Sequence, residues 1–130
     1  LDIDLSKESL KVNNLPGSTS KEKDLISFIR ENLIEGKAED IVEVSVDENF
    51  SEFDHLVIAS GSSNRQVIFL AEKLMEQVKS SYKIKGKIEG RENADWVLLD
   101  FQSVIVHIFR PEVREYYQIE KIWKDHLKNL

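Results

Sequence analysis

The chain has 130 residues, of which 41% are hydrophobic and 32% charged, and its formal net charge at pH 7 is −6. These values predict one globular domain with a sizeable core. The absence of cysteine excludes a disulfide framework and fits a reducing compartment. No apolar run is long enough to span a membrane, and we expect no membrane partner. The acidic balance favours a basic protein partner and little direct nucleic-acid binding, because phosphates are bound mainly by lysine and arginine.

Residues 1–18 show no periodic pattern, and the run from Asn13 to Ser18 would break a helix. We therefore predict a poorly ordered N-terminal extension over residues 1–18, whether native, processed or added for expression, and a folded domain over residues 19–130. Thr19 and Glu22 have the spacing of a capping box, and Gly36 is a natural helix stop. Between them, apolar residues recur at helical spacing: Leu25, Ile26, Ile29, Leu33 and Ile34.

The next segments predict two strands, a second helix and a short edge strand. Residues 41–46 alternate like a strand, and the nearly all-apolar residues 56–59 predict a central strand that is buried on both faces. Ser63 and Gln66 repeat the capping-box spacing at the start of a helix that runs to about residues 79–82. Residues 84–88 are interrupted by Gly86 and are typical of an edge strand.

Residues 96–101 and 104–109 predict a hairpin, because both are rich in β-branched and aromatic residues and only Gln102 and Ser103 separate them. A two-residue turn sets Leu99 opposite Val106 and Leu98 opposite His107. Side chains alternate between the faces of a strand. One face is then wholly apolar and is predicted as core: Val97, Leu99, Phe101, Val104, Val106 and Ile108. The other is mixed, and we expect function there: Trp96, Leu98, Asp100, Ile105, His107 and Phe109.

Pro111 opens the last predicted helix, since its missing N–H costs nothing in a first turn. An apolar and aromatic stripe at spacings of three and four continues from Val113 to Leu127. The element order is therefore helix, strand, strand, helix, three strands and helix. The predicted fold class is α/β, with a mixed sheet of about five strands and helices packed on it.

Two ordered blocks of this sequence resemble one protein family. The first consists of residues 96–100 and 104–110, Arg114, Tyr116, Tyr117 and residues 119–123, and the second consists of residues 54–66. With a weaker pattern over residues 23–46, they resemble the ribosomal silencing factor family, also called Iojap-like, over most of the chain. The sequence departs from the family at Gln102 and Ser103, where a glycine-containing turn is usual. The resemblance implies a nucleotidyltransferase-like topology without the catalytic carboxylates.

The resemblance also implies a function. Family members are not enzymes; they bind the large ribosomal subunit at large-subunit ribosomal protein fourteen, block its association with the small subunit and repress translation, for example in starvation. Organellar members act instead in ribosome assembly. The sequence lacks a basic, arginine-rich presequence, which favours a bacterial, cytoplasmic member. A homodimer of the free protein, which would use the mixed hairpin face on itself, is an open alternative.

Residues 60–65, Ser-Gly-Ser-Ser-Asn-Arg, lie between a strand and a helix N-terminus, where free N–H groups can hold an anion. A nucleotidyltransferase combines such a turn with closely spaced carboxylates that bind two metal ions. The following strand offers Lys85, Lys87 and Glu89 instead. A capped helix start without cofactor or metal is therefore favoured, and a nucleotidyltransferase-like enzyme is the alternative.

Asp100 and His107 are diagonal neighbours in the predicted hairpin, close enough to hydrogen-bond. A histidine oriented by a carboxylate is typical of a general base, but no nucleophile accompanies this pair. His55, His107 and His126 also lack the spacing of metal ligands. We therefore expect a structural polar pair, or contacts within an interface, and no catalytic residue.

An apolar patch with a polar rim is typical of the centre of a protein interface. Trp96 fits both core and interface, because large aromatic residues serve in both. Tyr116 and Tyr117 are adjacent on a helix, about 100° apart, so one of them is expected to keep its hydroxyl in water. The residues predicted to contact a partner are Trp96, Leu98 and Asp100 at the centre, Glu89 and Asp95 on the rim, and Tyr116 and Tyr117 as the next candidates.

Overall fold

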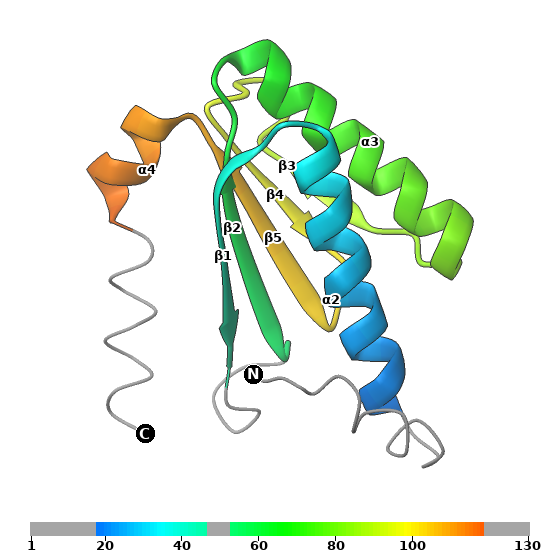
Figure 1. Ribbon diagram of the computed structural model, residues 1–130. Coiled ribbons are helices and arrows are strands. Elements are labelled where there is room, and N and C mark those ends of the chain that lie inside the picture. The colour runs from blue at the N-terminus through cyan, green and yellow to red at the C-terminus, as the bar shows by residue number, and fades with distance from the viewer. Residues whose placement is uncertain (1–17, 47–52, 119–130) are drawn as a thin grey trace.

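The computed structural model describes residues 18–46 and 53–118, with side chains from Asp24 on except that of Tyr117 (Figure 1). The order of helices and strands is the predicted one. The predicted extension up to residue 17 and the predicted positions of Trp123 and Leu127 lie outside the described residues, as do the side chains of Thr19 and Glu22. The elements are α2 (Ser18–Glu35), β1 (Glu39–Ser45), β2 (His55–Ser60), α3 (Asn64–Tyr82), β3 (Lys87–Glu89), β4 (Trp96–Asp100), β5 (Val104–Phe109) and α4 (Pro111–Tyr117).

The strands form one five-stranded sheet in the order β1-β2-β5-β4-β3. Strands β2 and β5 are parallel, and the other neighbouring pairs are antiparallel. The prediction of a mixed sheet of about five strands is therefore confirmed. Strand β2 lies inside the sheet with Leu56 to Ser60 buried, and β3 is the short edge strand.

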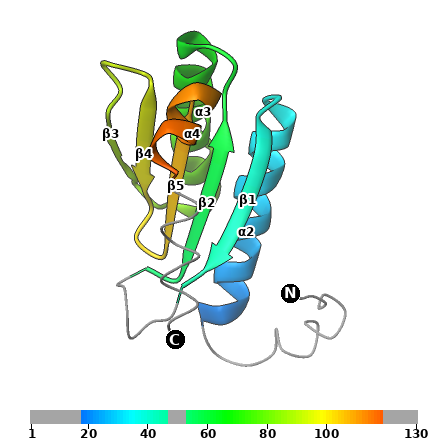
Figure 2. The same ribbon diagram turned by 90° about the vertical axis from the view of Figure 1, so that its left-hand side faces the viewer.

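Helices α2 and α3 cover one face of the sheet, and α4 lies on the opposite face near one end of the strands (Figures 1 and 2). The layer between the two long helices and the sheet is the main hydrophobic core. Each fully buried leucine or valine contributes about 1.5–3 kcal/mol through removal of apolar surface from water. Ile34, the last residue of the predicted apolar repeat, is 56% exposed near the end of α2. The helical part of this core consists of Leu25, Ile26, Ile29, Leu33, Val67, Leu70, Ala71, Leu74 and Val78.

The start of α3 follows the predicted cap only in part. The hydroxyl of Ser63 accepts a hydrogen bond from the backbone N–H of Gln66 at 3.1 Å, as a capping serine should. The Gln66 side chain does not return to the N–H of Ser63. Its Oε1 accepts from the N–H of Ser62 at 2.6 Å, and its Nε2 donates to the carbonyl of Gly36 at 3.1 Å. This glutamine therefore ties the start of α3 to the turn after α2.

Helix α4 agrees with the predicted last helix at its start but departs from it at residue 118. It begins at Pro111 as predicted, but it ends at Tyr117, where Gln118 adopts a left-handed conformation with φ 51°. The N–H of Gln118 donates to the carbonyl of Arg114, which closes the final turn. The helical repeat that was predicted to continue from Val113 is therefore interrupted at residue 118.

The hairpin between β4 and β5 turns at Gln102. The N–H of Ser103 donates to the carbonyl of Phe101 at 3.0 Å, and Gln102 has φ 75°, as in a γ-turn. The N–H of Gln102 donates to Oδ1 of Asp100 at 2.8 Å. The turn is thus made without the glycine that is usual in the resembling family, because the Asp100 side chain binds the central N–H.

Candidate partner-binding site

The register of the hairpin confirms the predicted assignment of its faces. Leu99 pairs with Val106 and Leu98 with His107 across β4 and β5. The six residues of the apolar face are at most 1% exposed and belong to the main core under α2 and α3. The opposite face of the hairpin, which was the predicted site, therefore lies on the side of the sheet that carries α4.

Part of this mixed face is core rather than free surface. Phe109 is 0% exposed and His107 is 7% exposed, which corrects the expectation that the whole face is available to a partner. Phe109 belongs to a second hydrophobic cluster, which forms because the neighbouring strand β2 presents buried apolar residues on the same side. That cluster consists of Val46, Leu56, Ile58 and Phe109, with Val42, Val44, Phe53, Trp96, Ile105 and Val113 packed against it. Leu98 and Asp100 are half-buried, and Glu89 is exposed.

Trp96 contacts two buried rings, those of Phe109 and His107. Its indole stacks on Phe109 with ring centroids 4.9 Å apart and 27° between the planes. Its Nε1 donates a hydrogen bond to Nδ1 of His107 at 2.8 Å. Trp96 is itself half-buried, so it serves the second cluster and still reaches the surface. The structure therefore shows Trp96 packed on this cluster with part of its side chain accessible, and its role in an interface stays a prediction.

His107 is a neutral acceptor in this arrangement. Burial disfavours the imidazolium and lowers the pKa of His107 to about 4. Since Nδ1 accepts the indole hydrogen, the neutral ring carries its own proton on Nε2. The predicted hydrogen bond with Asp100 is not formed, because the Asp100 carboxylate accepts from the turn and His107 accepts from Trp96. Asp100 therefore does not orient His107 as a base.

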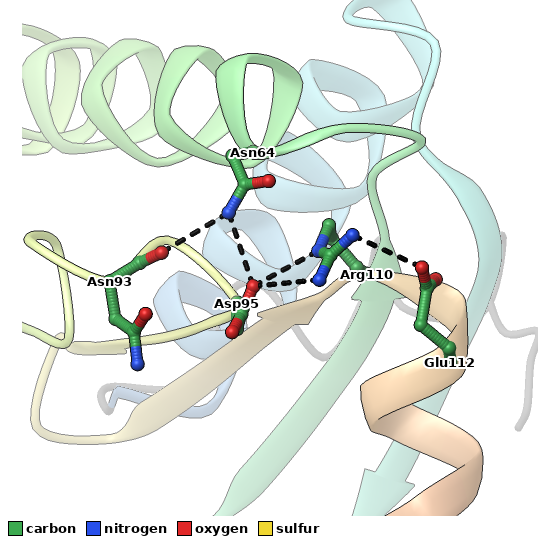
Figure 3. Close-up of polar contacts among 5 residues, drawn as sticks. All are labelled: Asn64, Asn93, Asp95, Arg110 and Glu112. Carbon is green, nitrogen blue, oxygen red and sulfur yellow. Dashed lines mark hydrogen bonds and ion pairs between the residues drawn. The ribbon is translucent and has the colours of Figure 1, made fainter.

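Asp95 is the centre of a polar cluster at the end of the hairpin (Figure 3). Its Oδ1 accepts from Nε of Arg110 at 3.0 Å and from Nδ2 of Asn64 at 3.1 Å. Nη1 of Arg110 also donates to Oε2 of Glu112 at 3.1 Å. Nδ2 of Asn64 contacts the carbonyl of Asn93 at 3.1 Å, so that the cluster joins the start of α3, the β3–β4 loop and the start of α4. The predicted rim residue Asp95 is thus partly neutralised by Arg110.

A hollow of about 480 Å³ opens beside this cluster. Of the described residues that line it, two are acidic and none is basic. Gly90, with φ 85°, allows the loop to approach the strand, because a Cβ there would lie 2.3 Å from the carbonyl oxygen of Trp96. Tyr116 stands at the hollow with 79% of its surface exposed, as expected for one of the two tyrosines. The lining residues are Gly90, Asn93, Asp95, Trp96, Glu112, Val113 and Tyr116.

The Ser60–Arg65 segment is built as a structural connection. The Ser60 hydroxyl is buried and accepts from Nη1 of Arg114 at 2.7 Å, which ties α4 to the end of β2. The Ser62 hydroxyl lies 2.8 Å from Oε1 of Gln66. Within residues 18–46 and 53–118, no group of three or more acidic or histidine side chains could hold a metal ion. None of the helices in these ranges is long and apolar enough to cross a membrane. The hydrogen bonds of Ser60, Ser62 and Ser63 agree with the favoured interpretation of a capped helix start.

The sequence analysis missed Asn64, Arg110, Glu112 and Val113 as parts of this site. Arg110 directly follows a strand and precedes Pro111, so a cation at the strand end was visible in the sequence. Its partner Asp95 precedes the other strand of the same hairpin, and the predicted register places the two residues at one end. That signal was sufficient to predict the ion pair. The contribution of Asn64, which is 31 residues from Asp95, had no such signal.

Comparison with known proteins identifies the family. The family model described as "Ribosomal silencing factor during starvation" matches residues 19–129. This chain belongs to that family. It is 41% identical over 99 residues to the ribosomal silencing factor RsfS of Zymomonas mobilis, which covers 76% of this chain and 74% of that protein. The resemblance inferred from the hairpin and the 54–66 block is therefore confirmed.

Two further similarities bear on fold and function. The crystal structure of a Chromobacterium violaceum protein superposes with a TM-score of 0.74 at 35% identity, covering 78% of this chain and 85% of that one. A mouse protein named "Mitochondrial assembly of ribosomal large subunit protein 1" is 33% identical over 76% of this chain and 43% of its own length. The family names describe ribosome-associated regulatory factors and do not describe enzymes.

Proposed function

We propose that this chain is a cytoplasmic translation repressor that binds the large ribosomal subunit at large-subunit ribosomal protein fourteen and thereby blocks association with the small subunit. Membership of the ribosomal silencing factor family supports a ribosomal partner. The observation that carries the surface assignment is the hollow beside Trp96, which combines two aromatic side chains with two carboxylates. Such a surface suits a basic protein, since aromatic faces and carboxylates both attract lysine and arginine side chains.

The proposed contact surface has Trp96 as its anchor, with Leu98 and Asp100 beside it on β4. Buried aromatic anchors carry much of the energy of an interface, and the surrounding residues mainly exclude water. Because Arg110 pairs with both Asp95 and Glu112, the negative charge of the rim rests more on the exposed Glu89. Tyr116, which also lines the hollow, extends this surface along α4, and Tyr117 stays a predicted contact residue.

The binding is proposed to be non-enzymatic and to use little direct contact with RNA. The described residues offer no metal-binding cluster for phosphoryl chemistry. An acidic chain with a net charge of −6 is repelled by ribosomal RNA, so stable docking needs a basic protein patch and a desolvated apolar centre. Incubation with magnesium and nucleoside triphosphates should give no turnover, and turnover that Ser62→Ala abolishes would contradict this part of the proposal.

The function is tested by co-sedimentation with purified large ribosomal subunits, together with light scattering of subunit joining. The chain should pellet with large subunits, slow their joining to small subunits, and be displaced by free ribosomal protein fourteen. Failure of the wild-type chain to pellet would contradict ribosome binding.

Assembly of the large subunit, which the name of the mouse relative favours, is the second candidate function. In that case the chain should pellet with immature large subunits and leave joining unaffected. A homodimer of the free chain would appear in sedimentation without ribosomes.

The surface is tested by Trp96→Ala, which should weaken binding by about 2 kcal/mol or more because it removes the anchor, while circular dichroism shows a retained fold. Phe69→Ala is a matched control, since Phe69 is a 50% exposed aromatic residue on α3, across the sheet from the proposed surface. If folded Trp96→Ala pellets like the wild type, this surface is wrong and the α4 tyrosines become the better candidates.

A further inference from the structure

We infer that His107 is a positioning residue for partner binding: its Nδ1 holds the Trp96 indole in the orientation that lines the hollow, so that the surface is formed before a partner arrives. The binding part of this inference rests on the proposed function. The positioning part rests on the contacts of Trp96 alone.

The register of the hairpin brings the two side chains together. Trp96 pairs with Phe109 and Leu98 with His107, so Trp96 and His107 are diagonal neighbours on one face of β4 and β5. The stack on Phe109 limits the tilt of the indole plane, with 27° between the rings. The bond from Nε1 to Nδ1, at 2.8 Å, limits rotation of the indole within that plane. Two rigid contacts in different directions therefore fix one orientation.

The chemistry of the pair keeps this bond available. An indole N–H can only donate, and a histidine Nδ1 accepts only while the ring is neutral. His107 is 7% exposed, and its burial keeps the ring neutral at pH 7. A leucine at position 107 would fill similar space without an acceptor. A histidine at position 107 is therefore explained by its hydrogen bond to the indole and not by the space that its side chain fills.

A fixed indole favours binding because less side-chain freedom is lost when the partner docks. The corresponding penalty for one side chain amounts to a loss of about three- to tenfold in affinity. Loss of the acceptor should therefore weaken binding by a similar factor, which is less than the loss expected on removing the indole itself.

The test compares His107→Leu with His107→Asn. The amide Oδ1 of asparagine is attached at Cγ, as Nδ1 is in histidine, so it restores an acceptor at nearly the same place. Ile105→Ala is the control for packing, because Ile105 lies on the same face of β5, in the same cluster, two residues away. Binding is measured by large-subunit pelleting. Acrylamide quenching of Trp96 fluorescence is measured in a Trp123→Phe background, since the chain has two tryptophans.

His107→Leu should increase quenching and weaken binding about three- to tenfold, and His107→Asn should return both towards wild type. The inference is overturned if His107→Leu leaves quenching unchanged, or if all three variants weaken binding equally. If the wild-type chain does not bind large subunits, the proposed function fails, and quenching alone decides the positioning. Should His107→Leu not fold, nitrogen NMR of the unaltered chain decides: a proton on Nδ1 at pH 7, or a freely exchanging Trp96 indole N–H, overturns the inference.

Discussion

The two faces of the β4–β5 hairpin are made by the same strands, but one is stabilised by hydrophobic burial and the other also by specific hydrogen bonds. On the face under α2 and α3, six apolar side chains are buried and need no specific partner. On the other face, polar groups lie among apolar ones and make specific hydrogen bonds: the Trp96 indole with His107, and Asp100 with the N–H of Gln102. Changes on the first face should therefore appear mainly as lost stability, and changes on the second as altered binding or pH dependence.

The largest expected effect is on the apolar face. Leu99→Ala should lower the free energy of unfolding by about 2–5 kcal/mol, because Leu99 is 0% exposed and its loss leaves a cavity. Leu98→Ala, one residue away on the other face and half-buried, should cost about 1 kcal/mol. Urea unfolding of both variants measures the difference. Equal losses would show that the two faces do not differ in this way.

The second prediction concerns the pH dependence of the free energy of unfolding, which depends on His107 of the mixed face. Free histidine titrates near pH 6.5, whereas the pKa of His107 in the folded chain is about 4. Between these values the unfolded chain binds a proton that the folded chain does not. Stability should thus fall as the pH is lowered through this window and level off below it, by an amount on the order of 3 kcal/mol.

His107→Asn is the control for this titration. Burial also lowers the pKa of His55, so that histidine adds a loss of the same sign. The difference in the free energy of unfolding between wild type and His107→Asn, followed from pH 7 to pH 4, isolates the contribution of His107. A pH-independent difference would mean that the imidazole titrates alike in both states.

The contrast between the faces also explains what the sequence could predict. The alternation of residues 96–109 was sufficient to predict the register of the hairpin and its apolar face, because only one register buries all six apolar side chains on the same face. The polar contacts depend on angles and loops that alternation does not contain. The sequence analysis paired His107 with Asp100, since both were diagonal neighbours, but Trp96 is a diagonal neighbour too and takes the acceptor. Likewise, the end of α4 at Tyr117 depends on one left-handed residue within an unbroken helical pattern.

The third prediction tests the charge of the mixed face. Glu89→Lys should slow association with large subunits by about fivefold at low salt and should weaken the salt dependence of the rate. Glu89 is exposed on β3, in register with Leu98. Glu76→Lys makes the same charge change on the exposed side of α3 and should have less effect. Stopped-flow measurements at several salt concentrations distinguish the two variants, and equal slowing would mean that only net charge matters.

The smallest effect is expected at the turn that keeps the two faces apart. Gln102 has φ 75°, a conformation that costs a residue with a Cβ about 1 kcal/mol or more. Gln102→Gly removes that strain and gives back part of the gain through the greater freedom of the unfolded chain, so the free energy of unfolding should rise by about 0.5–1 kcal/mol. Ser103→Gly, at a position without positive φ, should lower it by a similar amount.

Neither side chain belongs to the proposed contact surface, so pelleting with large subunits should not change. If Gln102→Gly destabilises the chain, the Gln102 side chain contributes more than its backbone conformation costs. If it alters pelleting, the turn sets the register of the mixed face, because a one-residue slip would exchange the side chains of the two faces.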